Sequence, residues 1–282
     1  LILTLPRRAA ASKLLLMLQG LGMLALVALQ LITIFFTQSR GPWIGMGAAL
    51  FVFFTLLLWR AYGRARAAGS PRAGLLRGLL AGEIGLALVL GAFLVAFNLS
   101  SAPVFQQLRS VPYIGRMGTL LETDSGTGLV RRLIWSGDDK AGGAVALITA
   151  EPLRTLIGWG PESMFVAYNK FYPPALANIE ARGASPDRSH EAYLDELVTK
   201  GVLGLASYLF VIISFFVLAW RLMQRSGNWR TQVLCIAGMS IVVGHSVEGL
   251  TGIPIVSSLM MLWVTMAVVV VAGALAGQYT IG

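Results

Sequence analysis

Six long apolar runs limit the folds open to this chain more than any other feature of its sequence. Each run approaches the roughly 17–25 residues that an α-helix needs to cross the hydrocarbon core of a bilayer. The runs cover approximately residues 14–36, 43–59, 77–97, 202–220, 231–247 and 254–276. Only 12% of the residues are charged, whereas about a quarter are charged in soluble domains. The sequence therefore predicts an all-α integral membrane protein with about six transmembrane helices.

Basic residues between the runs predict the orientation, because Lys and Arg are enriched in cytoplasmic segments. They precede the first run and fill the links after the second and fourth runs: Arg7, Arg8, Lys13, Arg60, Arg64, Arg66, Arg72, Arg77, Arg221, Arg225 and Arg230. We therefore expect both chain ends inside, and residues 37–42, 98–201 and 246–253 outside. The net charge of +9 is then a sign of orientation, and nucleic acid is not an expected partner.

The predicted spans divide the chain into three parts. Residues 1–97 would hold the first three transmembrane helices, residues 98–201 an extracytoplasmic loop with interfacial helices, and residues 202–282 the last three transmembrane helices. The first apolar run is too long for the core of a signal peptide, so we interpret it as a span. The single cysteine, Cys235, falls within the fifth run, so no disulfide framework is expected. Because the chain begins with Leu1 rather than Met, we expect further spans to precede it.

The outer segment is about a hundred residues long, and connections of this length usually carry structure or function. A helix is predicted from about Leu129 to Ala150, where a following proline ends it. The sequence GWGPES, residues 158–163, is typical of a turn-rich loop, and the prolines of residues 171–187 favour irregular backbone. A second helix is predicted from Ser189 to Gly201. Its apolar positions share one face, which suits a helix lying on the membrane surface.

The sequence TQSRGPWIG, residues 37–45, brings an arginine to the outer start of the second span. Ser39 is a suitable cap residue and Pro42 suits the first helical turn, so Arg40 is expected at a helix N-terminus. Such a terminus favours anions, and a guanidinium binds phosphate oxygens through two parallel hydrogen bonds. The alternative is an interfacial arginine whose head extends to water.

The sequence LVRRLIW, residues 129–135, carries a second pair of candidate arginines. Neighbouring residues of a helix point about 100° apart, so only one of Arg131 and Arg132 is expected to face a site. The alternative is a solvated charged face, with Trp135 as an anchor at the membrane interface. The adjacent acids Asp138 and Asp139 lack further ligands, which favours a solvated surface, and no metal site is expected.

His190 is one of only two histidines and lies within SPDRSHEAYLDEL, residues 185–197. The positive end of a helix dipole favours a neutral imidazole, which suits a base that takes a proton from a hydroxyl group. Asp187 and Glu191 would oppose this effect or orient the ring. A hydrogen-bonded structural histidine is the alternative. At the outer end of the fifth span, His245 and Glu248 lie three residues apart, and with Glu191 they are candidate supporting residues.

Together these motifs resemble the bacterial O-antigen ligase family, whose members are integral membrane glycosyltransferases grouped with surface-polysaccharide polymerases. The resemblance covers roughly residues 30–220 and rests on four motifs in order: SRGPW at 39–43, the Arg131–Trp135 spacing, Pro152 with GWGP, and SHEAYLDELVTKGVLG at 189–204. It implies a GT-C-like fold and inverting transfer of a glycan from an undecaprenyl-diphosphate carrier to an acceptor hydroxyl. It places this reaction on the outer face of the bacterial cytoplasmic (inner) membrane, without a metal or another cofactor.

The resemblance also implies residue roles and partners. Arg40 and Arg131 would hold the donor diphosphate, with Arg132 as the alternative, and His190 would act as the base. Family members usually have Asn after the histidine, where this chain has Glu191. They also typically have more spans, so either an N-terminal portion precedes this sequence or the chain is a shortened relative. The expected partners are a lipid-linked oligosaccharide and a glycan, lipid or protein acceptor. A polysaccharide polymerase or a protein O-oligosaccharyltransferase would share this chemistry. A flippase for lipid-linked sugars is less favoured, because the ionisable residues concentrate outside and no inverted repeat is evident.

Overall fold

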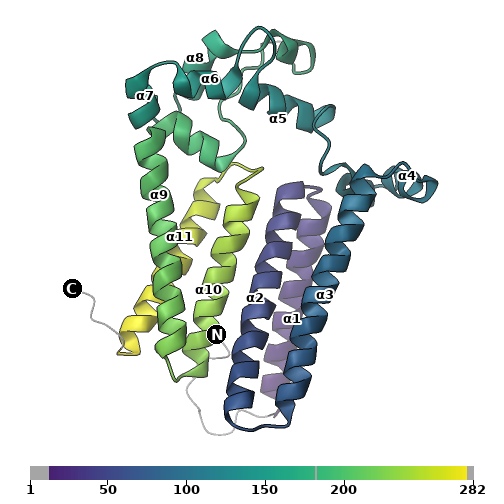
Figure 1. Cartoon of the computed structure of the whole chain (residues 1–282), viewed down its shortest axis with the longest axis vertical. Helices are drawn as coiled ribbons and strands as arrows, with labels where there is room; N and C mark the ends of the chain where they lie inside the picture. Colours follow the sequence, from purple (N-terminus) through teal and green to yellow (C-terminus); the bar gives the residue numbers. More distant parts are fainter. Residues whose placement is uncertain (1–12, 182, 278–282) are drawn as a thin grey trace.

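The computed structural model describes residues 13–181 and 183–277, and the regular structure of these residues is entirely helical. Within the described chain, six helices are long and apolar enough to cross a membrane (Figure 1). They are α1 (Lys13–Phe36), α2 (Arg40–Ala67), α3 (Arg72–Leu99), α9 (Ala192–Arg225), α10 (Trp229–Glu248) and α11 (Val256–Leu275). The all-α fold class is therefore confirmed, and the protein is a multi-pass membrane protein. Arg7 and Arg8, two of the residues used to predict the orientation, lie outside the described residues.

Helices α2 and α3 extend beyond the apolar runs that predicted them. Each contains 28 residues and is therefore about 42 Å long, whereas the hydrocarbon core is about 30 Å thick. The extra turns carry arginines at the end where α2 passes into α3. Hydropathy marked only the part of each helix that matches the bilayer, so the predicted boundaries were too short.

The long helices stand side by side as two groups, with α1, α2 and α3 in one and α9, α10 and α11 in the other (Figure 1). The groups meet where α2 packs against α10. A Cβ atom added to Gly45 would lie 2.7 Å from the carbonyl oxygen of Gly244, so these two backbones touch. Small residues at such crossings let transmembrane helices approach closely. Buried side chains that include Phe215, Met239 and Val269 fill the space among α9, α10 and α11.

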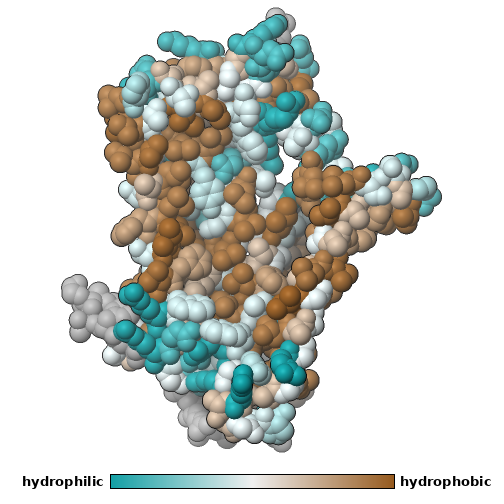
Figure 2. All heavy atoms as spheres, viewed as in Figure 1, coloured by the Kyte–Doolittle hydropathy of each residue, from teal (hydrophilic) through white to brown (hydrophobic). Residues whose placement is uncertain are grey.

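The segment between α3 and α9 gathers at one end of the bundle, which we call the outer end (Figure 1). Its described short helices are α4 (Pro103–Ser110), η1 (Ile114–Thr119), α5 (Gly126–Ser136), α6 (Gly143–Thr149), α7 (Pro152–Ile157), α8 (Met164–Ala167), η2 (Tyr168–Phe171) and η3 (Pro174–Asn178). A second buried cluster, which includes Leu147, Tyr168 and Val198, joins this layer to the start of α9. Figure 2 shows hydrophobic side chains over the middle of the molecule and hydrophilic ones at both ends.

The prediction of one helix from Leu129 to Ala150 is wrong, because α5 and α6 are separated by a turn over residues 137–142. Gly137 begins the turn with a φ of +75°. The Asp138 carboxylate then accepts backbone N–H bonds from residues 140 and 141 at 2.9 and 3.0 Å, and from Ala175 at 3.0 Å. These bonds, that from Ala175 foremost, lower the pKa of Asp138. This carboxylate therefore closes the turn and ties it to η3.

The second predicted outer helix begins at Ala192 rather than Ser189 and continues into the membrane as α9. Gly201 interrupts it with non-helical angles, φ +67° and ψ −169°, so the predicted boundary at this residue is present as a kink. The kink leaves helix carbonyls without their usual partners four residues on. Two of them, on Val198 and Thr199, instead accept backbone N–H bonds at 2.8 and 3.0 Å from the predicted GWGPES loop. The loop thus docks on the kink.

Candidate anion site at the outer end of the bundle

Arg40 is the first residue of α2, directly after the N-cap Ser39. This confirms the predicted helix start, although the Ser39 side chain makes no capping bond. The half-buried Arg40 guanidinium donates a hydrogen bond to the carbonyl oxygen of Thr119 on η1. It also lies within electrostatic range of two like charges, Arg116 and Arg131. An arginine at a helix start beside two further arginines forms a positive centre at the outer end of α2.

Arg131 lies on α5 with its side chain half-buried, whereas the neighbouring Arg132 is exposed. Burial lowers the pKa of Arg131, and the opposite charge of Glu248 on α10 counteracts that effect. Arg131 therefore interacts electrostatically both with Arg40 and with a carboxylate of the transmembrane bundle. Of the two adjacent arginines, only Arg131 is coupled to Arg40 in this way.

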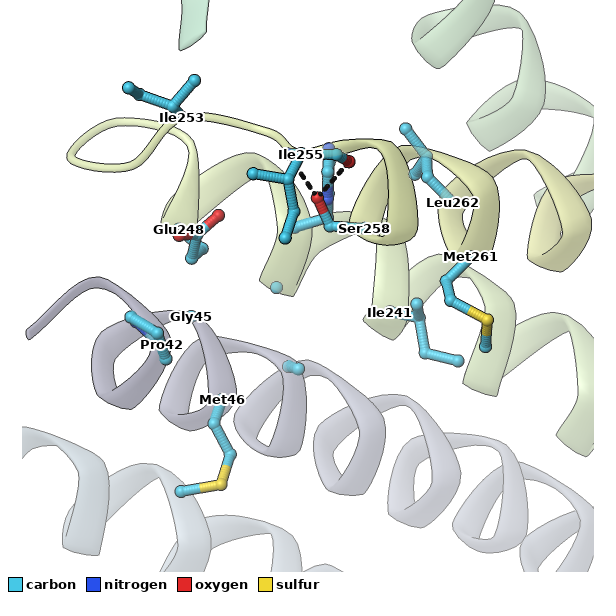
Figure 3. Close-up of a pocket in the computed structure, with 13 residues that line it drawn as sticks. Pro42, Gly45, Met46, Ile241, Glu248, Ile253, Ile255, Ser258, Met261 and Leu262 are labelled. Carbon is cyan, nitrogen blue, oxygen red and sulfur yellow. Dashed lines mark hydrogen bonds between the residues drawn. The ribbon is translucent and has the colours of Figure 1, made fainter. Parts of the chain in front are cut away.

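Glu248 ends α10 and lies against the first turns of α2. A Cβ atom added to Gly45 would lie 3.0 Å from the Cβ atom of Glu248, so glycine at this position lets the acidic side chain sit beside α2. Glu248 and His245 line an open cleft of about 550 Å³ between α2, α10 and α11. In Figure 3, Pro42 and Gly45 lie on the opposite wall of this cleft from Glu248. The two candidates predicted at the end of the fifth span therefore face the start of the second.

A separate groove of about 640 Å³ runs between α2 and α3. Its walls are almost entirely apolar, and its residues run from Phe54 and Glu83 in the membrane up to Trp43 in the first turn of α2. Met117 and Leu120 close its upper end. These two residues flank Thr119, whose carbonyl oxygen binds Arg40. The apolar groove therefore ends directly beneath the positive centre.

His190 precedes the N-cap of α9, so the prediction that it belongs to the helix is wrong. Its backbone has a φ of +56°, in the left-handed region that non-glycine residues rarely occupy. The preceding residue, Ser189, is fully buried, and both its backbone carbonyl and its backbone N–H form hydrogen bonds. Its carbonyl oxygen accepts from the Trp135 indole at 2.6 Å, and its N–H donates to Asp195 at 3.4 Å. These bonds hold His190 in its unusual backbone conformation.

Trp135 also connects His190 to the arginines. It lies four residues after Arg131, and residues four apart share one face of a helix. The backbone just before His190 therefore approaches the same face of α5 that carries Arg131. The His190 side chain is half-buried, and no hydrogen bond or ion pair to it occurs among the described residues. Its imidazole is thus available to a ligand.

Glu191 is the N-cap of α9. Its carboxylate accepts the backbone N–H groups of Tyr193 and Leu194 at 3.2 and 2.5 Å. Burial raises the pKa of Glu191, while these two bonds act in the opposite direction. Because both oxygens are engaged by the helix, Glu191 fixes where α9 begins and so where His190 stands.

No family model, curated protein or solved structure matches the chain. What the site can bind must therefore be inferred from its own residues. The strongest feature is the positive centre, which we define as Arg40, Arg116 and Arg131, with Glu122 and Glu248 as nearby acids.

Arg116 is the member of this centre that the sequence did not indicate. It lies in η1 as part of GRMG, residues 115–118, which matches no binding motif. Its Nε atom donates to the carbonyl oxygen of Gln38 at 3.4 Å, which brings it to the start of α2. Arg116 and Arg40 are 76 residues apart in sequence, and only the folding of η1 over α2 brings them together. The local sequence around Arg116 therefore gives no sign of its position.

Proposed function

We propose that this protein is a membrane glycosyltransferase that moves a glycan from an undecaprenyl-diphosphate carrier to an acceptor hydroxyl at the outer face of the bacterial cytoplasmic membrane. One observation carries the proposal: three arginines converge at the upper end of an apolar groove between α2 and α3. A ligand that fits both features has an anionic head and a long apolar tail. The motif resemblance to O-antigen ligases supports the same substrate.

The arginines suit a diphosphate in particular. Like charges held close together and partly out of water repel one another, and a bound anion relieves that repulsion. Guanidinium groups bind phosphate oxygens in pairs and keep their charge at any physiological pH. When the bond between the sugar and the diphosphate breaks, negative charge grows on the leaving oxygen. Positive groups already in position stabilise that charge as it develops.

His190 would serve the acceptor in this reaction. The acceptor oxygen attacks the anomeric carbon from the side opposite the diphosphate, which inverts the configuration there. The bonding electrons of the broken C–O bond leave with the diphosphate, and the proton of the attacking hydroxyl passes to the imidazole. The hydrogen bond from Trp135 to the residue before His190 would keep the imidazole on the arginine side of α5.

Two glycines of α3 offer a matched test of the groove. Gly91 lines it and Gly82 does not, and a Cβ atom on either would meet nothing within 4 Å. Gly91→Phe should therefore obstruct the groove, whereas Gly82→Phe should only alter a lipid-facing surface. In proteoliposomes we expect Gly91→Phe to raise the KM for a long-chain polyprenyl-diphosphate donor about tenfold, and to change the KM for a short-chain donor little. Equal effects of both variants on both donors would contradict the assignment of the groove to the donor tail.

A genetic experiment tests the reaction itself. Deletion of the gene should leave the donor unused, so lipid-linked glycan should accumulate in the producing bacterium. Accumulated full-length lipid-linked polymer would identify a ligase, and accumulated single repeat units would identify a polymerase. Unchanged surface glycans together with unchanged lipid-linked intermediates would overturn the proposed function.

A further inference from the structure

The arginines at the inner end of the bundle form none of the ion pairs found among the described residues. All thirteen Asp and Glu residues of the chain fall between Glu83 and Glu248 in sequence, and Glu83 lies within α3 while the others belong to the outer half. The inner ends of α2, α3, α9 and α10 nevertheless carry many positive charges: Arg60, Arg64, Arg66, Arg72, Arg77, Arg221, Arg225 and Arg230. Among the described residues, no ion pair neutralises any of these arginines.

Two of these arginines already form hydrogen bonds within the protein. Arg60 donates to the side-chain oxygen of Gln224 at 2.7 Å and to the carbonyl oxygen of Met223 at 3.2 Å. Arg64 donates to the carbonyl oxygen of Gly227 at 2.7 Å and lies over the Trp229 ring, 5.1 Å from its centroid. These contacts tie the end of α2 to the turn between α9 and α10, so Arg60 and Arg64 have a structural role.

Arg66 and Arg77 differ from Arg60 and Arg64, because their side chains form no hydrogen bond or ion pair among the described residues. They line a cavity of about 380 Å³ between the last turns of α2 and the first turns of α3, together with Tyr62, Ala73 and Gly74. Tyr62 and Arg66 lie four residues apart on α2 and so share a face. A Cβ atom on Gly74 would meet nothing within 4 Å, so the small residues of α3 leave the cavity open.

We propose that this cavity binds the phosphate headgroup of an anionic phospholipid of the inner leaflet. Two guanidinium groups and a tyrosine hydroxyl offer hydrogen bonds that suit a phosphodiester. The cavity lies just beyond the apolar parts of α2 and α3, which is the depth of lipid headgroups. Ile84 and Leu88 of α3 follow Arg77 by seven and eleven residues and so share its helix face. They are 42% and 70% exposed, and acyl chains would run along them. This site is independent of the proposed glycan transfer at the outer end.

The cavity can be tested with a pair of charge-matched variants. The protein is purified from mixed micelles of phosphatidylglycerol and phosphatidylcholine, and bound lipid is counted by native mass spectrometry. Arg66→Gln with Arg77→Gln should reduce the affinity for phosphatidylglycerol at least about tenfold, since the loss of even one hydrogen bond to a charged group typically costs about that much. Arg221→Gln with Arg225→Gln removes the same charge from the same end, and it should retain the lipid.

A third variant, Gly74→Leu, fills the cavity without changing the charge and should also release the lipid. Equal loss in the two charge variants would show that diffuse positive charge attracts the lipid, and the proposal would be wrong. It would also be wrong if wild-type protein retained phosphatidylcholine as well as phosphatidylglycerol. Competition by millimolar inorganic phosphate would indicate a site for free anions instead of a lipid site. Unchanged helix content by circular dichroism separates each result from misfolding.

Discussion

Replacement of Arg131 by alanine tests the positive centre most directly, because Arg132 beside it provides a matched control. Both residues lie on α5 and carry the same charge, yet Arg131 is half-buried near Arg40 and Glu248 while Arg132 is exposed. Arg131→Ala should weaken donor binding, and Arg132→Ala should leave it nearly unchanged. Arg131→Lys should fall between them, because an ammonium group keeps the charge but loses the planar fork.

The size of the effect follows from the contacts that Arg131 can make. A hydrogen bond to a charged group contributes about 1.5–3 kcal/mol, which corresponds to roughly a 10- to 150-fold change in affinity. Loss of Arg131 also leaves Glu248 half-buried without its cation, which costs stability whether or not a donor binds. The additional change Glu248→Gln removes that second cost. The double variant should therefore regain thermal stability relative to Arg131→Ala and should still bind donor poorly.

Two measurements on each variant decide the matter: the midpoint of thermal unfolding in detergent and the Kd for a polyprenyl-diphosphate-linked glycan in nanodiscs. If Glu248→Gln restored donor binding to Arg131→Ala, Arg131 would serve only to neutralise Glu248. If Arg131→Ala and Arg132→Ala bound donor equally well, the reasoning about the positive centre would be refuted.

Three further changes probe the His190 segment and the α9 kink. His190→Asn keeps a residue that tolerates positive φ; it should abolish transfer while the donor Kd stays unchanged, and transfer at the normal rate would exclude His190 as the base. Trp135→Phe removes one hydrogen bond to Ser189, which is worth about 1 kcal/mol. The rate constant for transfer in single-turnover assays should therefore fall about fivefold. An unchanged rate constant would contradict a positioning role for Trp135. Gly201→Ala forces a side chain into φ +67° and within 2.4 Å of the Leu156 carbonyl oxygen; the unfolding temperature should fall by several degrees, whereas Gly227→Ala, in open space, should not lower it.

The six apolar helices could be predicted because hydropathy is a property of single segments. The start of α2 could also be predicted, since Ser39 and Pro42 are local signals for a helix N-terminus. The kink at Gly201 also follows from local sequence, because glycine adopts the left-handed conformation without strain. Each of these features has a signal in neighbouring residues of the chain, although the GWGPES loop also docks on the kink.

The outer layer was harder to predict because contacts between distant residues determine it. The break between α5 and α6 depends on Asp138, whose carboxylate binds the backbone of Ala175. The start of α9 looked like Ser189, a favoured cap residue. In the fold, Ser189 is held by Trp135 and Asp195, and Glu191 caps the helix instead. Periodicity and capping rules contain no information about such partners.

The close packing of α2 on α10 links the bundle to the chemistry proposed at its outer end. Gly45 and Gly244 bring the two helices into backbone contact, and the last turn of α10 then sets Glu248 beside the first turn of α2. The Glu248 carboxylate offsets part of the positive charge of Arg131. None of the ion pairs among the described residues joins Glu248 to Arg40. The centre of three arginines thus keeps a net positive charge. In the proposed reaction this residual charge would attract the donor diphosphate, and the nearby Glu248 carboxylate would weaken the hold on the free diphosphate and so favour its release after transfer.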